Sequence, residues 1–202
     1  MSDILCVTNR ALCREDFLTR VKAIAAAHPA GILLREKDLT AGQYRALASE
    51  VLHICRTHGT PCILHSFAEV AAELHCPALH LPLRLLRQLT EPEKKRFPVL
   101  GTSCHSVEDA TEAERLGCTY LIAGHIFDTD CKKGLPGRGL TFLKEVCTAV
   151  RIPVYAIGGI QPGNIGQIRQ AGASGGCVMS GAMVCDTVST YLSAFEEERH
   201  AI

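Results

Sequence analysis

A dense group of ionisable residues follows an apolar stretch in the second half of the chain. The run Gly124–Gly139, "GHIFDTDCKKGLPGRG", holds one His, two Asp, one Thr, one Cys, two Lys, one Arg and four Gly. An imidazole titrates near neutral pH and can both accept and donate a proton, so His125 is a candidate general acid/base. The glycines suit a loop that closes over a charged ligand. The alternative is a solvated surface loop with a structural histidine.

Two further segments combine apolar residues with glycine. They are "AIGGI" at 156–160 and "VMSGA" at 178–182. Glycine lets the backbone approach phosphate oxygens, to which its N–H groups can donate. We therefore predict a phosphate site made of four residues: Gly158, Gly159, Ser180 and Gly181. In the alternative interpretation, the glycines only turn the chain.

A third segment, "LLREKDL" at 33–39, carries two cations next to two carboxylates. Arg35 and Lys37 are two residues apart at the end of an expected strand, so their side chains leave the same face. Arginine can hold an anion in a forked arrangement and lysine can act as a point charge. The alternative is a local ion-pair cluster with Glu36 and Asp38.

The elements that must position these residues follow a repeating pattern. Continuously apolar runs, typical of parallel strands buried on both faces, predict eight strands: 4–8, 31–35, 61–64, 77–81, 98–103, 119–123, 153–157 and 176–180. Amphipathic stretches predict helices over 15–27, 40–58, 66–74, 106–116, 140–150, 162–171 and 186–199, and the segment 82–90 is barely long enough for another.

Eight β–α repeats without a linker predict an α/β fold, a (β/α)₈ TIM barrel, as a single domain over residues 1–202. A doubly wound open sheet would need a glycine-rich first turn, whereas the first turn here reads "TNRALC". In a barrel the active site lies at the carboxyl ends of the strands, so the polar residues that follow each strand should converge.

Three more histidines belong to this expected ring: His65, His80 and His105. Histidines on separate strands can form a metal site, but no Asp or Glu directly follows the third or fourth strand, which disfavours magnesium. We therefore expect neither a metal ion nor a cofactor.

Composition excludes several classes of function. Lys+Arg and Asp+Glu both total 21, and no basic run indicates binding to nucleic acid or to a membrane surface. The first residues do not read as a secretory signal. The 11 cysteines show no C-x-x-C spacing and, apart from Cys131 in the glycine-rich loop, are expected to be core residues in a reducing cytosol. We expect a cytoplasmic protein, and a homo-oligomer is compatible with the sequence.

Five segments together resemble the thiamine phosphate synthase/TenI superfamily over about Cys6 to Gly181. They read "LREKDLT", "GTSCHSVEDATEAERLG", "YLIAGHIFDTDCKKG", "IPVYAIGGI" and "AGASGGCVMSGA". The synthases of this superfamily typically carry Asn-Asp after strand three and a carboxylate after strand four, which hold magnesium on a pyrophosphate substrate. Here the corresponding positions read His65-Ser66 and "HLPLRLL", with Pro82 and no acid.

The central loop instead resembles that of TenI-type thiazole tautomerases, which aromatise the carboxythiazole ylidene phosphate of thiamin biosynthesis. The resemblance implies a thiazole phosphate as the small-molecule substrate and His125 as the acid/base residue. We expect Thr129 and Lys132 to line the closing loop, and Arg35 and Lys37 to hold the substrate carboxylate. Cys131 replaces a synthase threonine and has no assigned role.

Two other functions stay open at this point. One is a magnesium-dependent thiamine phosphate synthase, and the other is a non-catalytic regulator that binds a phosphorylated ligand on an enzyme scaffold.

Overall fold

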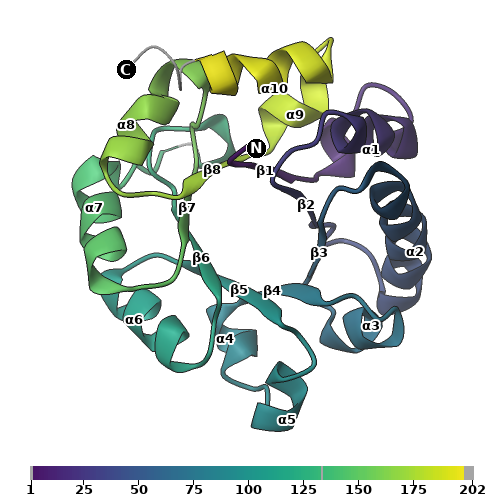
Figure 1. Cartoon of the computed structure of the whole chain (residues 1–202), viewed down its shortest axis with the longest axis horizontal. Coiled ribbons are helices and arrows are strands. Elements are labelled where there is room, and N and C mark those ends of the chain that lie inside the picture. Colours follow the sequence, from purple (N-terminus) through teal and green to yellow (C-terminus); the bar gives the residue numbers. More distant parts are fainter. Residues whose placement is uncertain (1, 133, 198–202) are drawn as a thin grey trace.

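The chain forms a closed barrel of eight parallel strands in sequence order, which confirms the predicted TIM barrel (Figure 1). The computed structural model describes residues 2–132 and 134–197. The strands are β1 Ile4–Val7, β2 Gly31–Leu34, β3 Cys62–His65, β4 Ala78–Pro82, β5 Val99–Cys104, β6 Tyr120–Gly124, β7 Val154–Ile157 and β8 Gly175–Val178. Because all strands are parallel, their carboxyl ends meet at one mouth of the barrel.

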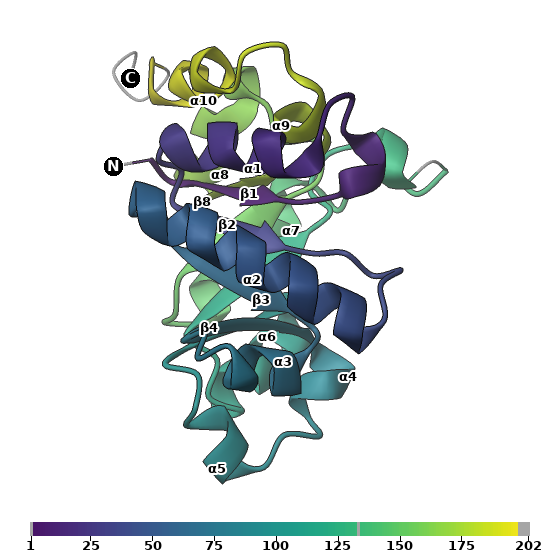
Figure 2. The same cartoon turned by 90° about the vertical axis from the view of Figure 1, so that its right-hand side faces the viewer.

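Helices surround the strands and cover their outer faces. Their bounds are α1 Phe17–Ala26, α2 Ala41–His58, α3 Ala68–Glu73, α4 Leu83–Leu86, α5 Glu91–Lys94, α6 Val107–Arg115, α7 Gly139–Ala149, α8 Ile165–Gln170, α9 Ser180–Val184 and α10 Val188–Glu197. The side view shows α1 and α2 lying next to each other along the outside of the barrel (Figure 2). Within the described residues, no helix is long and apolar enough to cross a membrane.

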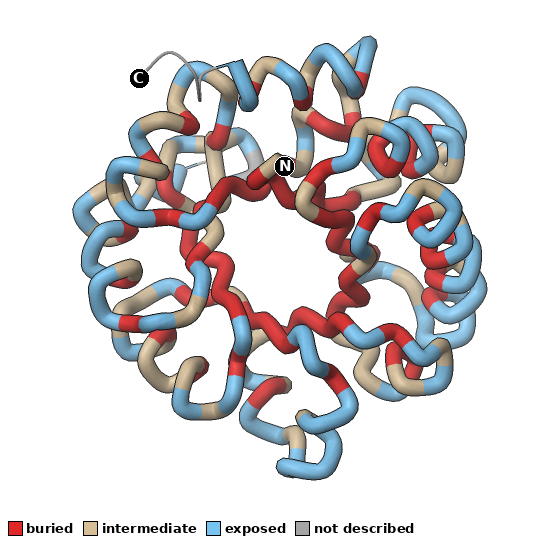
Figure 3. The backbone as a smooth tube through the Cα atoms, viewed as in Figure 1, coloured by how far each residue is buried: buried red, intermediate tan, exposed pale blue. Residues whose placement is uncertain are grey.

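Burial explains why the strands could be recognised in the sequence. All residues of β1, β2, β6 and β8 are buried, and the strand ring is almost continuously buried in Figure 3. Side chains that point inward fill the barrel and those that point outward meet the helices, so both faces of a strand are apolar.

Local capping residues define several helix boundaries. The Thr40 hydroxyl accepts from the Gln43 N–H, and Gly59 ends α2 with a left-handed φ of 66°. Ser106 caps α6 by accepting from the Asp109 N–H. The segment 82–90 differs from the other connections because it holds the one-turn helix α4 and the approach to α5. The last predicted helix falls partly at 198–199, outside the described residues.

Candidate active site

A cavity of about 1350 Å³ opens at the carboxyl ends of the strands. All nine residues predicted from the sequence line it: Arg35, Lys37, His125, Thr129, Lys132, Gly158, Gly159, Ser180 and Gly181. Their convergence from four segments, after β2, β6, β7 and β8, follows from barrel closure, and the individual roles stay predictions.

His125 directly follows β6 and begins the loop that connects β6 to α7. Residues of this loop line the cavity. The Nε2 atom of His125 lies 3.2 Å from the carbonyl oxygen of Leu135. A carbonyl only accepts hydrogen bonds, so we assign the neutral ring a proton on Nε2 and an accepting lone pair on Nδ1. The backbone oxygen of His125 accepts from the Arg138 N–H at 2.9 Å. The loop therefore holds both the ring and the backbone of this residue.

The first residues of the loop between β6 and α7 are hydrogen-bonded to the end of the neighbouring strand, β7. The Ile126 N–H donates to the Ile157 oxygen at 2.9 Å, and the Phe127 N–H donates to the Gly158 oxygen at 3.0 Å. Of the glycines expected to permit closure, Gly134 adopts a φ of 81°, whereas Gly137 packs closely against residues 126–127. These glycines thus serve a defined turn, and closure of the loop stays a prediction.

Packing against this loop also demands glycine at two predicted phosphate ligands. Gly158 and Gly159 have φ values of 98° and 67°, which disfavour any side chain. A Cβ atom at Gly159 would lie 2.7 Å from the Asp128 oxygen and 2.7 Å from the Phe127 Cβ atom. The sequence did not reveal this constraint, and it holds whether or not a phosphate binds here.

The β7–β8 side of the mouth nevertheless offers donors to an anion. Among the described residues, no acceptor is found for the backbone N–H groups of Gly159, Ser180 and Gly181, although all three residues line the cavity. Tyr191 of α10 also lines it, and burial raises the pKa of its hydroxyl to about 12. Sequence reasoning missed Tyr191 because it lies on a helix well after the last strand.

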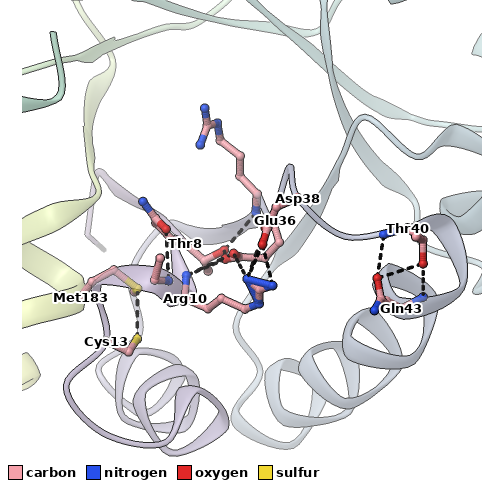
Figure 4. Close-up of polar contacts among 11 residues, drawn as sticks. Thr8, Arg10, Cys13, Glu36, Asp38, Thr40, Gln43 and Met183 are labelled. Carbon is pink, nitrogen blue, oxygen red and sulfur yellow. Dashed lines mark hydrogen bonds and ion pairs between the residues drawn. The ribbon is translucent and has the colours of Figure 1, made fainter.

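The carboxylates next to Arg35 and Lys37 are engaged elsewhere (Figure 4). Glu36 is only 3% exposed and accepts from the Thr8 hydroxyl at 2.7 Å. Asp38 pairs with the Arg10 guanidinium, with 2.6 Å between Nη2 and Oδ2. The acidic residues of "LLREKDL" therefore make their ion pairs with Arg10, while Arg35 and Lys37 line the cavity.

The opposite side of the mouth gathers positive charge. Partial burial lowers the pKa of Lys37, and the nearby charges of Arg35, Lys132 and Arg84 lower it further. Arg84 belongs to α4 and was not predicted as a site residue, although "HLPLRLL" contains it. A cavity that is lined by four cations, three of which lower the pKa of the fourth, is suited to an anion.

Two of the histidines of the expected ring lie inside the barrel. His80 is 1% exposed, with its Nδ1 atom 2.9 Å from the Tyr120 hydroxyl and its Nε2 atom 2.9 Å from the Ser103 hydroxyl. The His65 ring stacks on it at 5.8 Å, and its Nδ1 atom is 2.7 Å from the Ser66 hydroxyl. Burial, followed by the charges of Arg35 and Lys37, lowers the pKa of His65 to about 3.

His105 follows β5 and lines the same cavity as His125. Its Nδ1 atom lies 2.8 Å from the Gly124 oxygen, so Nδ1 carries the proton and Nε2 is the accepting nitrogen. Its backbone N–H donates to Asp109 at 2.9 Å. Within the described part of the chain, no group of three or more His, Cys, Asp or Glu side chains is arranged to hold a metal ion.

These features define a (β/α)₈-barrel protein with a polar cavity, lined by several cations, at the carboxyl ends of its strands. The model of the TMP-TENI family, described as thiamine monophosphate synthase, matches residues 4–182. The chain therefore belongs to this family of thiamine-biosynthesis enzymes, whose ligands are phosphorylated thiamine precursors.

Similar proteins carry the name of one activity within this family. The chain is 34% identical to thiamine-phosphate synthase 2 of Streptococcus pneumoniae serotype 4, an alignment that covers 97% of this chain and 94% of the relative. It is 32% identical to thiamine-phosphate synthase of Clostridium acetobutylicum, with 88% and 85% covered. A solved structure of thiamine phosphate pyrophosphorylase from Pyrococcus furiosus has a TM-score of 0.83 at 23% identity, with 98% and 95% covered, which shows the shared fold.

Proposed function

We propose that this protein is a thiazole tautomerase that aromatises the carboxythiazole ylidene phosphate by proton transfer through His125. The observation that carries the proposal is the placement of His125 in a cavity that offers backbone donors on one side and cations on the other. A substrate with a phosphate and a carboxylate would present one anionic group to each of these two sides. The resemblance of the central loop to that of the TenI-type tautomerases supports the same activity.

The reaction is an isomerisation in which one proton changes place. Nδ1 of His125 removes the proton from the ring carbon that bears the carboxylate, and the resulting negative charge spreads onto that carboxylate. Cations beside the carboxylate stabilise this charge as it develops. The imidazolium then returns a proton to the exocyclic carbon of the ylidene, and the thiazole becomes aromatic. No group other than the histidine has to gain or lose a proton.

A magnesium-dependent thiamine phosphate synthase is the second candidate, because the names of the similar curated proteins favour it. That activity needs oxygen ligands that hold magnesium on pyrophosphate. The ends of β3 and β4 carry His65, Ser66 and Pro82 instead of acids. The aspartates that line the cavity are Asp109, Asp128 and Asp130, and two of them accept backbone hydrogen bonds.

Two assays on the same preparation separate these candidates. The first follows conversion of the ylidene substrate by the absorbance of the aromatic thiazole, with and without EDTA. The second supplies hydroxymethylpyrimidine pyrophosphate, thiazole phosphate and magnesium, and measures pyrophosphate release. We expect EDTA-resistant turnover in the first assay and no release in the second. Pyrophosphate release without turnover of the ylidene would reject the tautomerase in favour of the synthase, and inactivity in both assays would favour a non-catalytic regulator.

A further inference from the structure

The two sides of the cavity recognise anions by different means. On the β7–β8 side the donors are backbone N–H groups and the Tyr191 hydroxyl, which carry no net charge. On the side of β2 and α4 the donors are charged side chains. In the closed order β1 to β8, strands β3 and β4 lie across the barrel from β7 and β8. A ligand that spans the mouth would therefore meet one side with each end.

Arg84 is the cation of this cluster that the family resemblance does not account for. It is the second residue of α4, two residues after the end of β4, and lines the cavity. Arg84 and Lys37 line the same cavity, and the charge of Arg84 contributes to the lowered pKa of Lys37. Among the described residues, no carboxylate forms an ion pair with Arg84.

Arg87, one turn further along, gives the contrast. It also lines the cavity, but its guanidinium is held by both carboxylate oxygens of Glu112 at 2.7 Å. An arginine committed to such a bidentate pair has few donors left for a ligand. Arg84 and Arg87 are thus both exposed arginines that line the cavity. They differ because the guanidinium of Arg87 is already paired with a carboxylate of the protein.

We infer that Arg84, with Lys37 and Lys132, forms a carboxylate subsite that selects ligands bearing a carboxylate opposite a phosphate. The inference rests on the proposed function and names the recognition of its substrate class. Gathering these like charges is unfavourable in the empty site, and a bound carboxylate removes that repulsion. Arginine adds a planar fork that matches a carboxylate in two hydrogen bonds.

The test compares two ligands that differ only in the carboxylate. Calorimetry measures binding of carboxythiazole phosphate and of thiazole phosphate to the wild type, Arg84→Gln and Arg87→Gln. We expect Arg84→Gln to weaken binding of the carboxylated ligand by about tenfold or more, as expected for a lost hydrogen bond to a charged group. Binding of thiazole phosphate should stay within about twofold, and Arg87→Gln should leave both affinities unchanged because it breaks only an exposed ion pair.

Three results would overturn the subsite. If Arg84→Gln weakened the binding of both ligands equally, Arg84 would contact the phosphate. If it left both affinities unchanged, Arg84 would take no part in binding. If the wild type bound both ligands with equal affinity, the carboxylate would not be recognised. Circular dichroism verifies that each variant is folded. An NMR titration of the Lys37 Nζ group gives a second readout, since losing the Arg84 charge should raise the pKa of Lys37.

The subsite and the tautomerase can fail separately. Carboxylate selectivity that depends on Arg84, in a protein that does not turn over the ylidene, would reject the proposed reaction and keep the subsite. Turnover of the ylidene without any selectivity for the carboxylate would reject the subsite and keep the proposed reaction.

Discussion

Four histidines lie within or directly after consecutive strands, β3 to β6, and they form two contrasting pairs. His65 and His80 lie inside the barrel, where burial lowers both pKa values and hydroxyl groups are the partners. His105 and His125 line the mouth, where backbone carbonyls are the partners.

The nature of the partner decides what each ring can do. A hydroxyl both donates and accepts, so a buried neutral imidazole is satisfied in either tautomer and becomes a structural connector. A carbonyl only accepts, so it fixes the proton on one ring nitrogen and directs the other nitrogen's lone pair elsewhere. The buried pair is therefore expected to contribute to stability, while the mouth pair has the lone pair that the proposed proton transfer needs.

The largest effect should follow from replacing His125. His125→Asn removes the group that exchanges the proton, and turnover should fall by about 10²–10⁴-fold, or roughly 3–5 kcal/mol of barrier. Single-turnover conversion measured by thiazole absorbance reports the rate. Calorimetric binding of the product should be largely retained, because the expected anion-binding residues other than Thr129 and Lys132 follow other strands. Turnover within about threefold of the wild type, far less than the loss of a general base, would show that another residue moves the proton.

Replacing His80 should affect stability instead. His80→Leu leaves the Tyr120 and Ser103 hydroxyls without their imidazole partner. We expect a loss of about 2–3 kcal/mol in the free energy of unfolding, as for buried polar groups left unpaired, measured by urea denaturation. His80→Gln is the control, since its amide can both donate and accept and should recover part of the loss. Equal losses in both variants would contradict the connector role.

The buried pair should also make the fold sensitive to acid. The pKa of His65 is about 3 in the folded protein and near 6.5 when unfolded, so the unfolded chain binds more protons between these pH values. The contribution of the neutral His65 to the free energy of unfolding is therefore fully present above about pH 6.5. It decreases as the pH falls, by about 1.5 kcal/mol between pH 6.5 and 5. Urea denaturation across this range should show a smaller pH dependence for His65→Asn than for the wild type. An unaltered pH dependence would mean that His65 is not neutral in the fold.

The smallest effect is expected at His105. Its Nδ1–H group holds the oxygen of Gly124, the residue before His125. His105→Asn can still offer an N–H donor there and should keep turnover within about threefold, while His105→Ala should lose about fivefold, the equivalent of one net hydrogen bond. Equal losses of about 10²-fold or more in both variants would make His105 a second acid/base. The pH–rate profile distinguishes the two roles, because a positioning residue leaves it unchanged.

The strands and the cavity residues show how much of the structure could be predicted from the sequence. The observed strands lie within two residues of the predicted ranges, because parallel strands buried on both faces leave an apolar run that is readable without any partner. The polar residues after the strands were expected to converge, and many of them line one cavity, whereas Thr8, Asn9 and Arg10 after β1 do not. By contrast, Arg84 and Tyr191 were missed because they lie on helices, and which helical residue reaches the mouth depends on how each helix packs.

The sequence alone did not give the roles of the charged residues at 35–38 or of the glycines at 158–159, because these depend on partners from other segments. Glu36 and Asp38 are neighbours of Arg35 and Lys37 in sequence, yet their ion-pair partner is Arg10 from the preceding strand end. Gly158 and Gly159 were interpreted through a ligand, whereas contact with the loop after β6 already demands glycine.

By itself, the sequence determined the barrel, the end of the barrel that carries the site, and the loop in which His125 lies, because strand burial and strand-end position are local and periodic properties. The tertiary structure alone decided which histidines are neutral and buried, which nitrogen of each mouth histidine carries the proton, and which cations line the same cavity. These properties depend on desolvation and on partners contributed by distant strands, and both arise only when the barrel closes.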